Sequence, residues 1–115
     1  MKAIVQKVEL RRIDDVWKKH KPQGLGFSDT DVVIVTLKTE EGKTYDEDFY
    51  CRLKADGTLG RSMTRASDKR QQNLLQFVKK YISLDQKYNV RDNLHTWKGK
   101  EVDVRKLGGS CCIKL

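Results

Sequence analysis

Residues 31–54, DVVIVTLKTEEGKTYDEDFYCRLK, decide the fold. Residues 31–39 are rich in β-branched side chains and apolar on both parities, which predicts a central strand covered on both faces. Residues 43–54 alternate, so that one face is apolar and the other polar. A turn at residues 40–43 joins them, where Gly42 can adopt a positive φ. The stretch therefore predicts an antiparallel hairpin, whose second strand has an apolar face made of Tyr45, Phe49, Cys51 and Leu53, with Glu47 as the exception.

The sequence before the hairpin predicts a first strand over residues 2–13. Its apolar parity is expected to be Ile4, Val8 and Leu10, with Gln6 as the exception. Ile13 and Val16 break the alternation, which indicates a bulge or turn near residues 14–15. Residues 17–26 contain the only proline and two glycines, and they predict a loop.

The sequence after the hairpin predicts one good helix and two short strands. Ser67 is the expected N-cap of a helix over about residues 68–82, whose apolar side is formed by Leu74, Leu75, Val78, Tyr81 and Ile82. Residues 83–96 fit either a short second helix or a structured loop, with Leu84, Tyr88 and Leu94 as anchors. Strands are expected at residues 101–106 and 110–115.

This order of three strands, a helix and two strands is typical of the five-stranded Greek-key barrel known as the OB-fold. The alternative is a two-layer α+β domain with one helix packed on an antiparallel sheet. Three features resemble small OB-fold single-stranded DNA-binding proteins of phage and archaeal type: the hairpin 31–54, the helix after it, and residues 92–104, DNLHTWKGKEVDV. The resemblance implies a groove across the middle strands that follows a nucleic-acid backbone, with aromatic side chains stacked on bases.

Length and composition restrict the class of protein. The 115 residues fit one domain, 1–115. The longest apolar run, Val32 to Val35, is far shorter than the ~20 residues of a membrane-spanning helix. The N-terminal residues lack the apolar centre of a signal peptide, so we expect an intracellular, cytoplasmic protein. Three cysteines are an odd number, which argues against a disulfide framework.

The net charge of +8 is unevenly distributed along the chain. Residues 1–25 carry +4, residues 57–82 carry +5 and residues 83–115 carry +3, whereas residues 26–56 carry −4. A basic surface attracts polyanions, and nucleic acid is the most abundant one inside a cell. The alternative is that the excess charge serves only solubility.

Binding a flexible single strand requires cations along a groove and exposed aromatic faces. Tyr50 is expected on the polar side of its strand, beside Arg52, whereas the alternative for any single aromatic is packing at a barrel end. Further candidates are Lys21, Phe27, Trp97, Lys98, Lys100, Arg105 and Lys106. The predicted nucleic-acid-binding residues are Arg11, Arg12, Trp17, Lys18, Lys19, Tyr50, Arg52, Arg61, Arg65, Lys69 and Arg70.

The hairpin also carries acidic residues that would repel phosphates: Glu40, Glu41, Asp46, Glu47 and Asp48. Either a bound strand avoids this part of the hairpin, or residues 40–48 dock on a basic protein partner. The second reading makes the chain an interaction module or adaptor subunit. A Mg²⁺ or Ca²⁺ site has no ligand loop to support it here, so a solvated acidic face is favoured.

No constellation in the sequence predicts catalysis or a cofactor. Cys51, Cys111, Cys112, His20 and His95 show no spacing typical of a metal site. Ser62, Ser67 and Ser110 lack a glycine elbow. We therefore expect a non-enzymatic protein without a metal. Residues 112–115 formally fit a prenylation box, although their alternation favours a closing strand. The oligomeric state is open.

Overall fold

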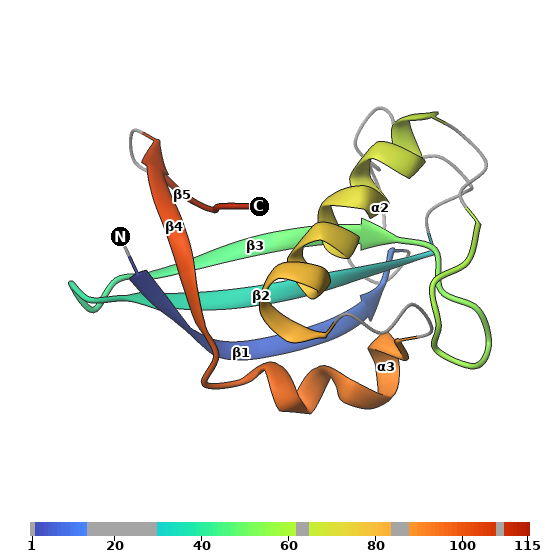
Figure 1. Cartoon of the computed structure of the whole chain (residues 1–115), viewed down its shortest axis with the longest axis horizontal. Helices are drawn as coiled ribbons and strands as arrows, with labels where there is room; N and C mark the ends of the chain where they lie inside the picture. Colours follow the sequence, from blue (N-terminus) through green and yellow to red (C-terminus); the bar gives the residue numbers. More distant parts are fainter. Residues whose placement is uncertain (1, 14–29, 62–64, 84–87, 108–109) are drawn as a thin grey trace.

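The computed structural model describes residues 2–13, 30–61, 65–83, 88–107 and 110–115. They form a curled antiparallel sheet (Figure 1). Its strands are β1 (Lys2–Arg12), β2 (Asp31–Thr39), β3 (Thr44–Cys51), β4 (Glu101–Leu107) and β5 (Ser110–Ile113). The helical elements are α2 (Arg65–Phe77), η1 (Val78–Ile82), α3 (Val90–Asn93) and η2 (Leu94–Trp97).

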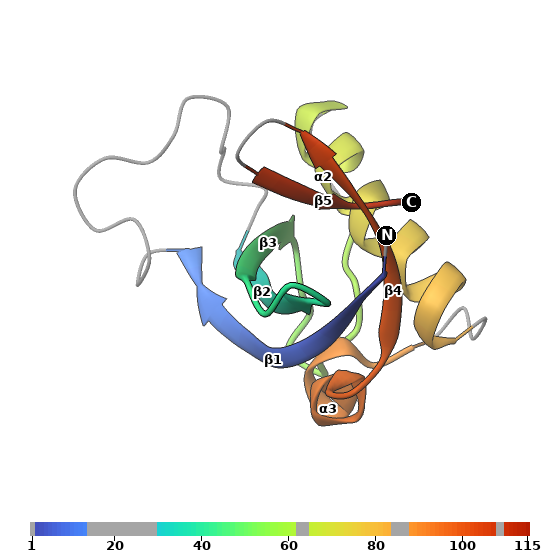
Figure 2. The ribbon, with the colours of Figure 1, turned by 90° about the vertical axis from the view of Figure 1, so that its left-hand side faces the viewer.

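The strand order in the sheet is β3-β2-β1-β4-β5. The outer strands β3 and β5 come into contact, so the sheet curls into a nearly closed barrel, seen from its end in Figure 2. The helix α2 connects β3 to the second half of the barrel. This arrangement confirms the predicted OB-fold-like Greek-key barrel over the two-layer alternative.

The strand β1 differs from its prediction in the side chains that face the core. Ile4 is 42% exposed, whereas its neighbours Ala3 and Val5 are buried. The reason is a β-bulge: the register with β2 shifts between Val5 and Lys7, which makes Gln6 an extra residue. Beyond the bulge the even-numbered residues of β1 face the core, and Val8 and Leu10 pack there. The bulge or turn expected at residues 14–15 lies outside the described residues.

The hairpin agrees with the sequence in the bounds of β2 and in its turn, whereas β3 ends at Cys51, three residues before the predicted end at residue 54. Gly42 has φ +82° at the turn. The apolar parity of β3 faces the core as predicted. However, β2 is not covered on both faces along its length: Val32 is buried on the outer face, but Ile34 and Thr36 are half-buried and Lys38 is exposed.

The helix α2 begins earlier than the sequence indicates. Ser67 is not its N-cap but lies inside the first turns, 1% exposed, where its Oγ accepts a hydrogen bond from Arg70 Nη2 at 3.3 Å. The helix ends in the π-helical turn η1. Phe77 is fully buried, and its ring centre lies 5.3 Å from that of Phe49 and 5.3 Å from that of Trp97. The helix is therefore fixed to the core through aromatic contacts.

The region 83–96 contains a short helix, one of its two predicted alternatives. Asn89 precedes α3, and its side chain accepts a hydrogen bond from the backbone N–H of Asp92 at 3.0 Å. Tyr88 and Leu94 pack against the core as expected, whereas Leu84 lies outside the described residues.

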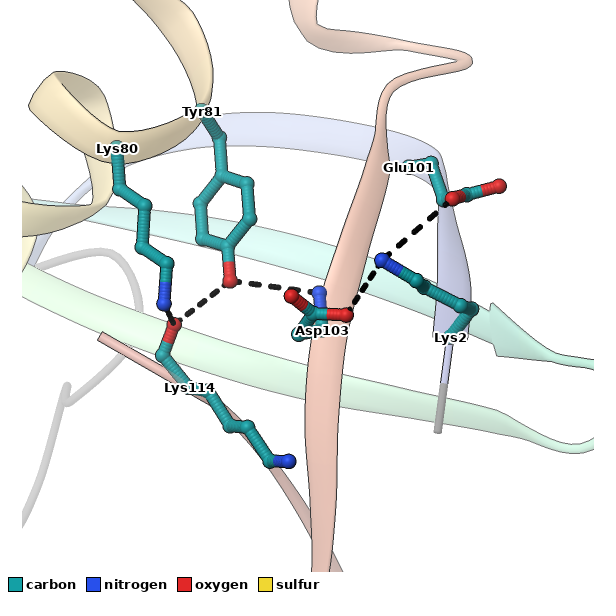
Figure 3. A network of polar contacts seen from close by, with 6 residues as sticks. All are labelled: Lys2, Lys80, Tyr81, Glu101, Asp103 and Lys114. Carbon is teal, nitrogen blue, oxygen red and sulfur yellow. Dashed lines mark hydrogen bonds and ion pairs between the residues drawn. The ribbon is translucent and has the colours of Figure 1, made fainter.

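The last residues are part of the barrel (Figure 3). The Lys114 carbonyl accepts hydrogen bonds from the Tyr81 hydroxyl at 2.7 Å and from Lys80 Nζ at 3.2 Å. The Lys114 N–H donates to the Asp103 carbonyl at 2.8 Å. Asp103 pairs with Lys2 at 2.7 Å, and this contact raises the pKa of Lys2 and lowers that of Asp103. Of the formal prenylation box, residues 112–113 belong to β5 with Ile113 buried, but the strand ends there, two residues before the predicted end, and Leu115 is 40% exposed.

Candidate nucleic-acid interface

Three strands meet at the end of the barrel where β1 ends, β2 begins and β3 ends (Figure 1). Arg11 lies opposite Val32, which in turn lies opposite Tyr50. Residues paired across strands project from the same face, and strands are about 4.8 Å apart, so the Cα atoms of Arg11 and Tyr50 are about 10 Å apart. Arg11 is exposed and Tyr50 half-buried. A cation and an aromatic ring thus share one row of the outer face.

Gln71 joins the end of β3 to α2. The Arg52 N–H donates to Gln71 Oε1 at 2.9 Å, and Gln71 Nε2 donates to the Gly60 carbonyl at 2.7 Å. The Gly60 N–H donates to the Arg52 carbonyl at 2.7 Å. Gln71 is only 6% exposed. This closed set of bonds fixes Arg52 next to the middle of α2.

The first half of α2 adds exposed cations to the same end. Arg65 and Lys69 are four residues apart and therefore share one helix face. Neither they nor Arg61 form an ion pair with another residue in the described ranges. Unpaired cations retain their full attraction for an anion. We call this region the basic end and define it as Arg11, Arg12, Tyr50, Arg52, Arg61, Arg65, Lys69 and Arg70.

The basic end holds eight of the predicted binding residues, but they do not all share one face, because Arg12 lies in the row of Asp31 and the core-facing Cys51, on the other face of β1 from Arg11. The other three, Trp17, Lys18 and Lys19, lie outside the described residues, as do Lys21 and Phe27. Gln71 is the residue that sequence reasoning missed. Its spacing does carry a signal, because Gln71 lies three residues before Leu74 and seven before Val78 and so shares the buried face of the helix.

The remaining candidates do not belong to the basic end. Trp97 is 0% exposed, and its Nε1 donates to the Tyr88 hydroxyl at 2.7 Å, so it cannot stack on a base. Lys98 and Lys100 precede β4 beside the start of β1. Lys106 pairs with Glu41 at 2.7 Å, a contact that lowers the pKa of Glu41. Trp97, Lys98, Lys100 and Lys106 therefore lie apart from the basic end.

An acidic region adjoins the basic end on the same face of the sheet. Glu9 and Asp48 lie on either side of Ile34, and Asp46 lies opposite Thr36, whose hydroxyl donates to Asp46 Oδ1 at 2.7 Å. We call Glu9, Asp46 and Asp48 the acidic strip. Partial burial, with the nearby charge of Asp46, raises the pKa of Asp48. Phosphates would meet repulsion here.

The acidic residues of the hairpin 40–48 do not share one surface. Glu41 is bound to β4 through Lys106, and Asp46 and Asp48 face outward. Glu47 occupies the core-facing parity of β3, half-buried, where burial and then the charge of Asp48 raise its pKa. No observation in the described part of the hairpin therefore favours its use as one docking surface.

The described residues contain no group of three or more His, Cys, Asp or Glu side chains placed to hold a metal ion. Cys51 is buried in the core and Cys112 is half-buried. Across the parts of the chain that the structure covers, no helix is long and apolar enough to cross a bilayer.

Comparison of the chain with protein-family models, with curated proteins and with solved structures gave no match. The assignment of an interface therefore depends on the geometry of this chain alone.

Proposed function

We propose that this protein binds single-stranded nucleic acid, DNA in preference to RNA, with little dependence on base sequence. The contact surface is the basic end. In OB-folds the face of strands 2 and 3 with its flanking loops is the usual place for an oligonucleotide. The preference for DNA follows from the resemblance to small single-stranded DNA-binding proteins.

The observation that carries the proposal is the row formed by Arg11, Val32 and Tyr50. It offers a cation and an aromatic ring about 10 Å apart on the outer face of strands 1 to 3. Sequence-tolerant binders combine these two features, since cations follow the phosphates and rings stack on bases. The chain's net charge of +8 would speed the encounter with a polyanion.

The acidic strip limits where a strand can run. Asp48 is two residues from Tyr50 along β3, a separation of about 7 Å. A bound strand therefore crosses the sheet at the Tyr50 row and continues toward Arg52, which Gln71 fixes to the middle of α2. The footprint is short and covers only one end of the barrel.

Fluorescence anisotropy with labelled single-stranded DNA, single-stranded RNA and duplex DNA, each at two or more salt concentrations, tests the proposal. We expect the highest affinity for single-stranded DNA, a lower one for single-stranded RNA and the lowest for duplex DNA. The affinity should fall with salt at a log–log slope of about −0.7 per phosphate neutralised. Equal affinity for duplex, or binding that is independent of ionic strength, would contradict the proposal.

Two substitutions of Tyr50 test the aromatic part. Tyr50→Ala should weaken binding by roughly 1–3 kcal/mol if the ring stacks on a base. Tyr50→Phe keeps the ring and should bind like the unmodified protein, which makes it the matched control. A normal affinity in the alanine variant would leave the cations as the only contact and remove Tyr50 from the interface.

A further inference from the structure

A cavity of about 440 Å³ opens on the outer face at the opposite end of β2 from the basic end. It lies where the start of β1, the end of β2 and the turn before β4 meet. Lys38 is six residues along β2 from Val32, which corresponds to about 20 Å. The cavity is thus separate from the proposed interface, and its volume is within the usual range for small-molecule sites.

The floor of the cavity is apolar because of the bulge in β1. Because the bulge at Gln6 shifts the register, Ile4 faces outward. Ile4 is one of two large apolar side chains that are exposed in the described ranges. Ile4 lies opposite Lys38 on one side and Glu101 on the other. Gly99 completes the lining with φ +92° and open space where a side chain would begin.

The charges around the cavity favour an anion. Its lining includes Lys2, Lys38 and Lys98 against Glu40 and Glu101, an excess of one positive charge. Lys2 Nζ pairs with Asp103 Oδ1 at 2.7 Å and lies 3.8 Å from Glu101 Oε1, so its charge is already engaged by these two carboxylates. Lys38 and Lys98 form no ion pair with any other described residue. Two ammonium groups are therefore free to hold an acidic group at the rim.

We propose that this cavity binds a nucleotide, with the face of the base on Ile4 and the phosphate on Lys38 and Lys98. Bases stack on apolar as well as aromatic side chains, and lysine is a common phosphate ligand. The same chemistry is present in a free mononucleotide and in the phosphorylated end of a strand. The inference goes beyond the proposed function, because a free nucleotide could occupy the cavity whether or not the basic end binds a strand.

Titration of the full chain with AMP and with adenosine, followed by amide NMR shifts, tests this assignment. We expect shifts at Ile4, Lys38 and Gly99, and an affinity for AMP roughly five-fold above that for adenosine, since exposed ion pairs contribute modestly. Shifts confined to other residues, or equal affinity for AMP and adenosine, would overturn the proposal.

Variants separate the two parts of the contact. The double change Lys38→Gln and Lys98→Gln should abolish the preference for AMP over adenosine. Ile4→Gln should weaken the binding of both compounds. The control, Lys43→Gln with Lys79→Gln, removes the same charge outside the cavity lining and should leave the preference intact. If the control loses the preference as well, general electrostatics explain it and the site is refuted. Thermal unfolding checks that each variant is folded.

A final comparison identifies the source of the nucleotide. Single-stranded DNA with and without a 5′ phosphate is titrated into the unmodified protein and into the Lys38→Gln, Lys98→Gln variant. If the phosphate strengthens binding only in the unmodified protein, the cavity accepts a strand end. If it has no effect while AMP still binds in the cavity, the ligand is a free nucleotide. AMP binding without any binding of DNA would support the cavity and refute the proposed function. DNA binding without any binding of AMP would support the proposed function and refute the cavity.

Discussion

The basic end and the acidic strip lie on the same face of the same three strands, yet they carry opposite charge. Arg11 and Tyr50 lie on either side of Val32, and one row further along the sheet Glu9 and Asp48 lie on either side of Ile34. The change of sign takes place over about 7 Å, less than the Debye length of ~8 Å at physiological salt. The two regions therefore influence one another, and the acidic strip reduces the attraction of the basic end for phosphates.

The largest effect should come from removing the unpaired cations of the basic end. The triple variant Arg61→Gln, Arg65→Gln and Lys69→Gln should weaken single-stranded DNA binding by about two orders of magnitude near 50 mM salt. Its salt dependence should be shallower by about two units of log–log slope, because up to three phosphates are no longer neutralised. Fluorescence anisotropy at several salt concentrations measures both quantities.

The matched control for this variant is Lys43→Gln, Lys79→Gln and Lys100→Gln. It removes the same three charges from exposed positions outside the basic end. A purely global effect of net charge would weaken both triple variants equally, and that outcome would refute a localised interface.

The basic end could be foreseen only in part from the sequence. Alternation places Tyr50 on the outer face, as observed, because β3 is a regular strand with a period of two, whereas Arg52 lies just beyond the end of β3. Arg65 and Lys69 were found as a basic stretch, although the helix begins three residues earlier than Ser67 suggested. The spacing of Gln71 to Leu74 places it on the buried face of the helix, but its bonds to Arg52 and Gly60 could not be predicted, because these partners are 19 and 11 residues away in sequence.

The outward position of Ile4 could not be predicted either. Gln6 interrupts the apolar parity of Ile4, Val8 and Leu10, but a single polar residue does not specify a bulge, and without the bulge the alternation points Ile4 inward. Register is decided by long-range pairing with β2. Likewise, the direction of β4 decides that Lys98 and Lys106 lie away from the basic end, and no local pattern specifies how two distant strands pair.

An intermediate effect should follow from neutralising the acidic strip. The double variant Asp46→Asn and Asp48→Asn should bind single-stranded DNA several-fold more tightly, since two exposed charges near the strand no longer repel it. The gain should disappear at high salt. Glu40→Gln with Glu41→Gln is a control at the turn of the same hairpin. An unchanged affinity in the Asp46, Asp48 variant would mean that the strand runs further from the strip than the Tyr50 row.

The smallest effect concerns stability and comes from Asp48 alone. Its pKa is raised by partial burial and by Asp46, so the folded state holds this proton more tightly than the unfolded chain does. The charged form therefore costs stability above the folded pKa, and this cost disappears as the pH falls below the unfolded value of about 3.9. Because the side chain is largely exposed, Asp48→Asn should raise the free energy of unfolding at pH 7 by less than about 1 kcal/mol.

Urea unfolding of the Asp48→Asn variant and of the unmodified protein, from pH 3 to pH 8, measures this difference. The gain should be present at neutral pH and absent at the acidic limit. Since Asp48 also raises the pKa of Glu47, the NMR titration midpoint of Glu47 should fall in the same variant. A gain that persists unchanged at pH 3 would point to altered packing around Ile34, and the electrostatic coupling within the hairpin would then have to be abandoned.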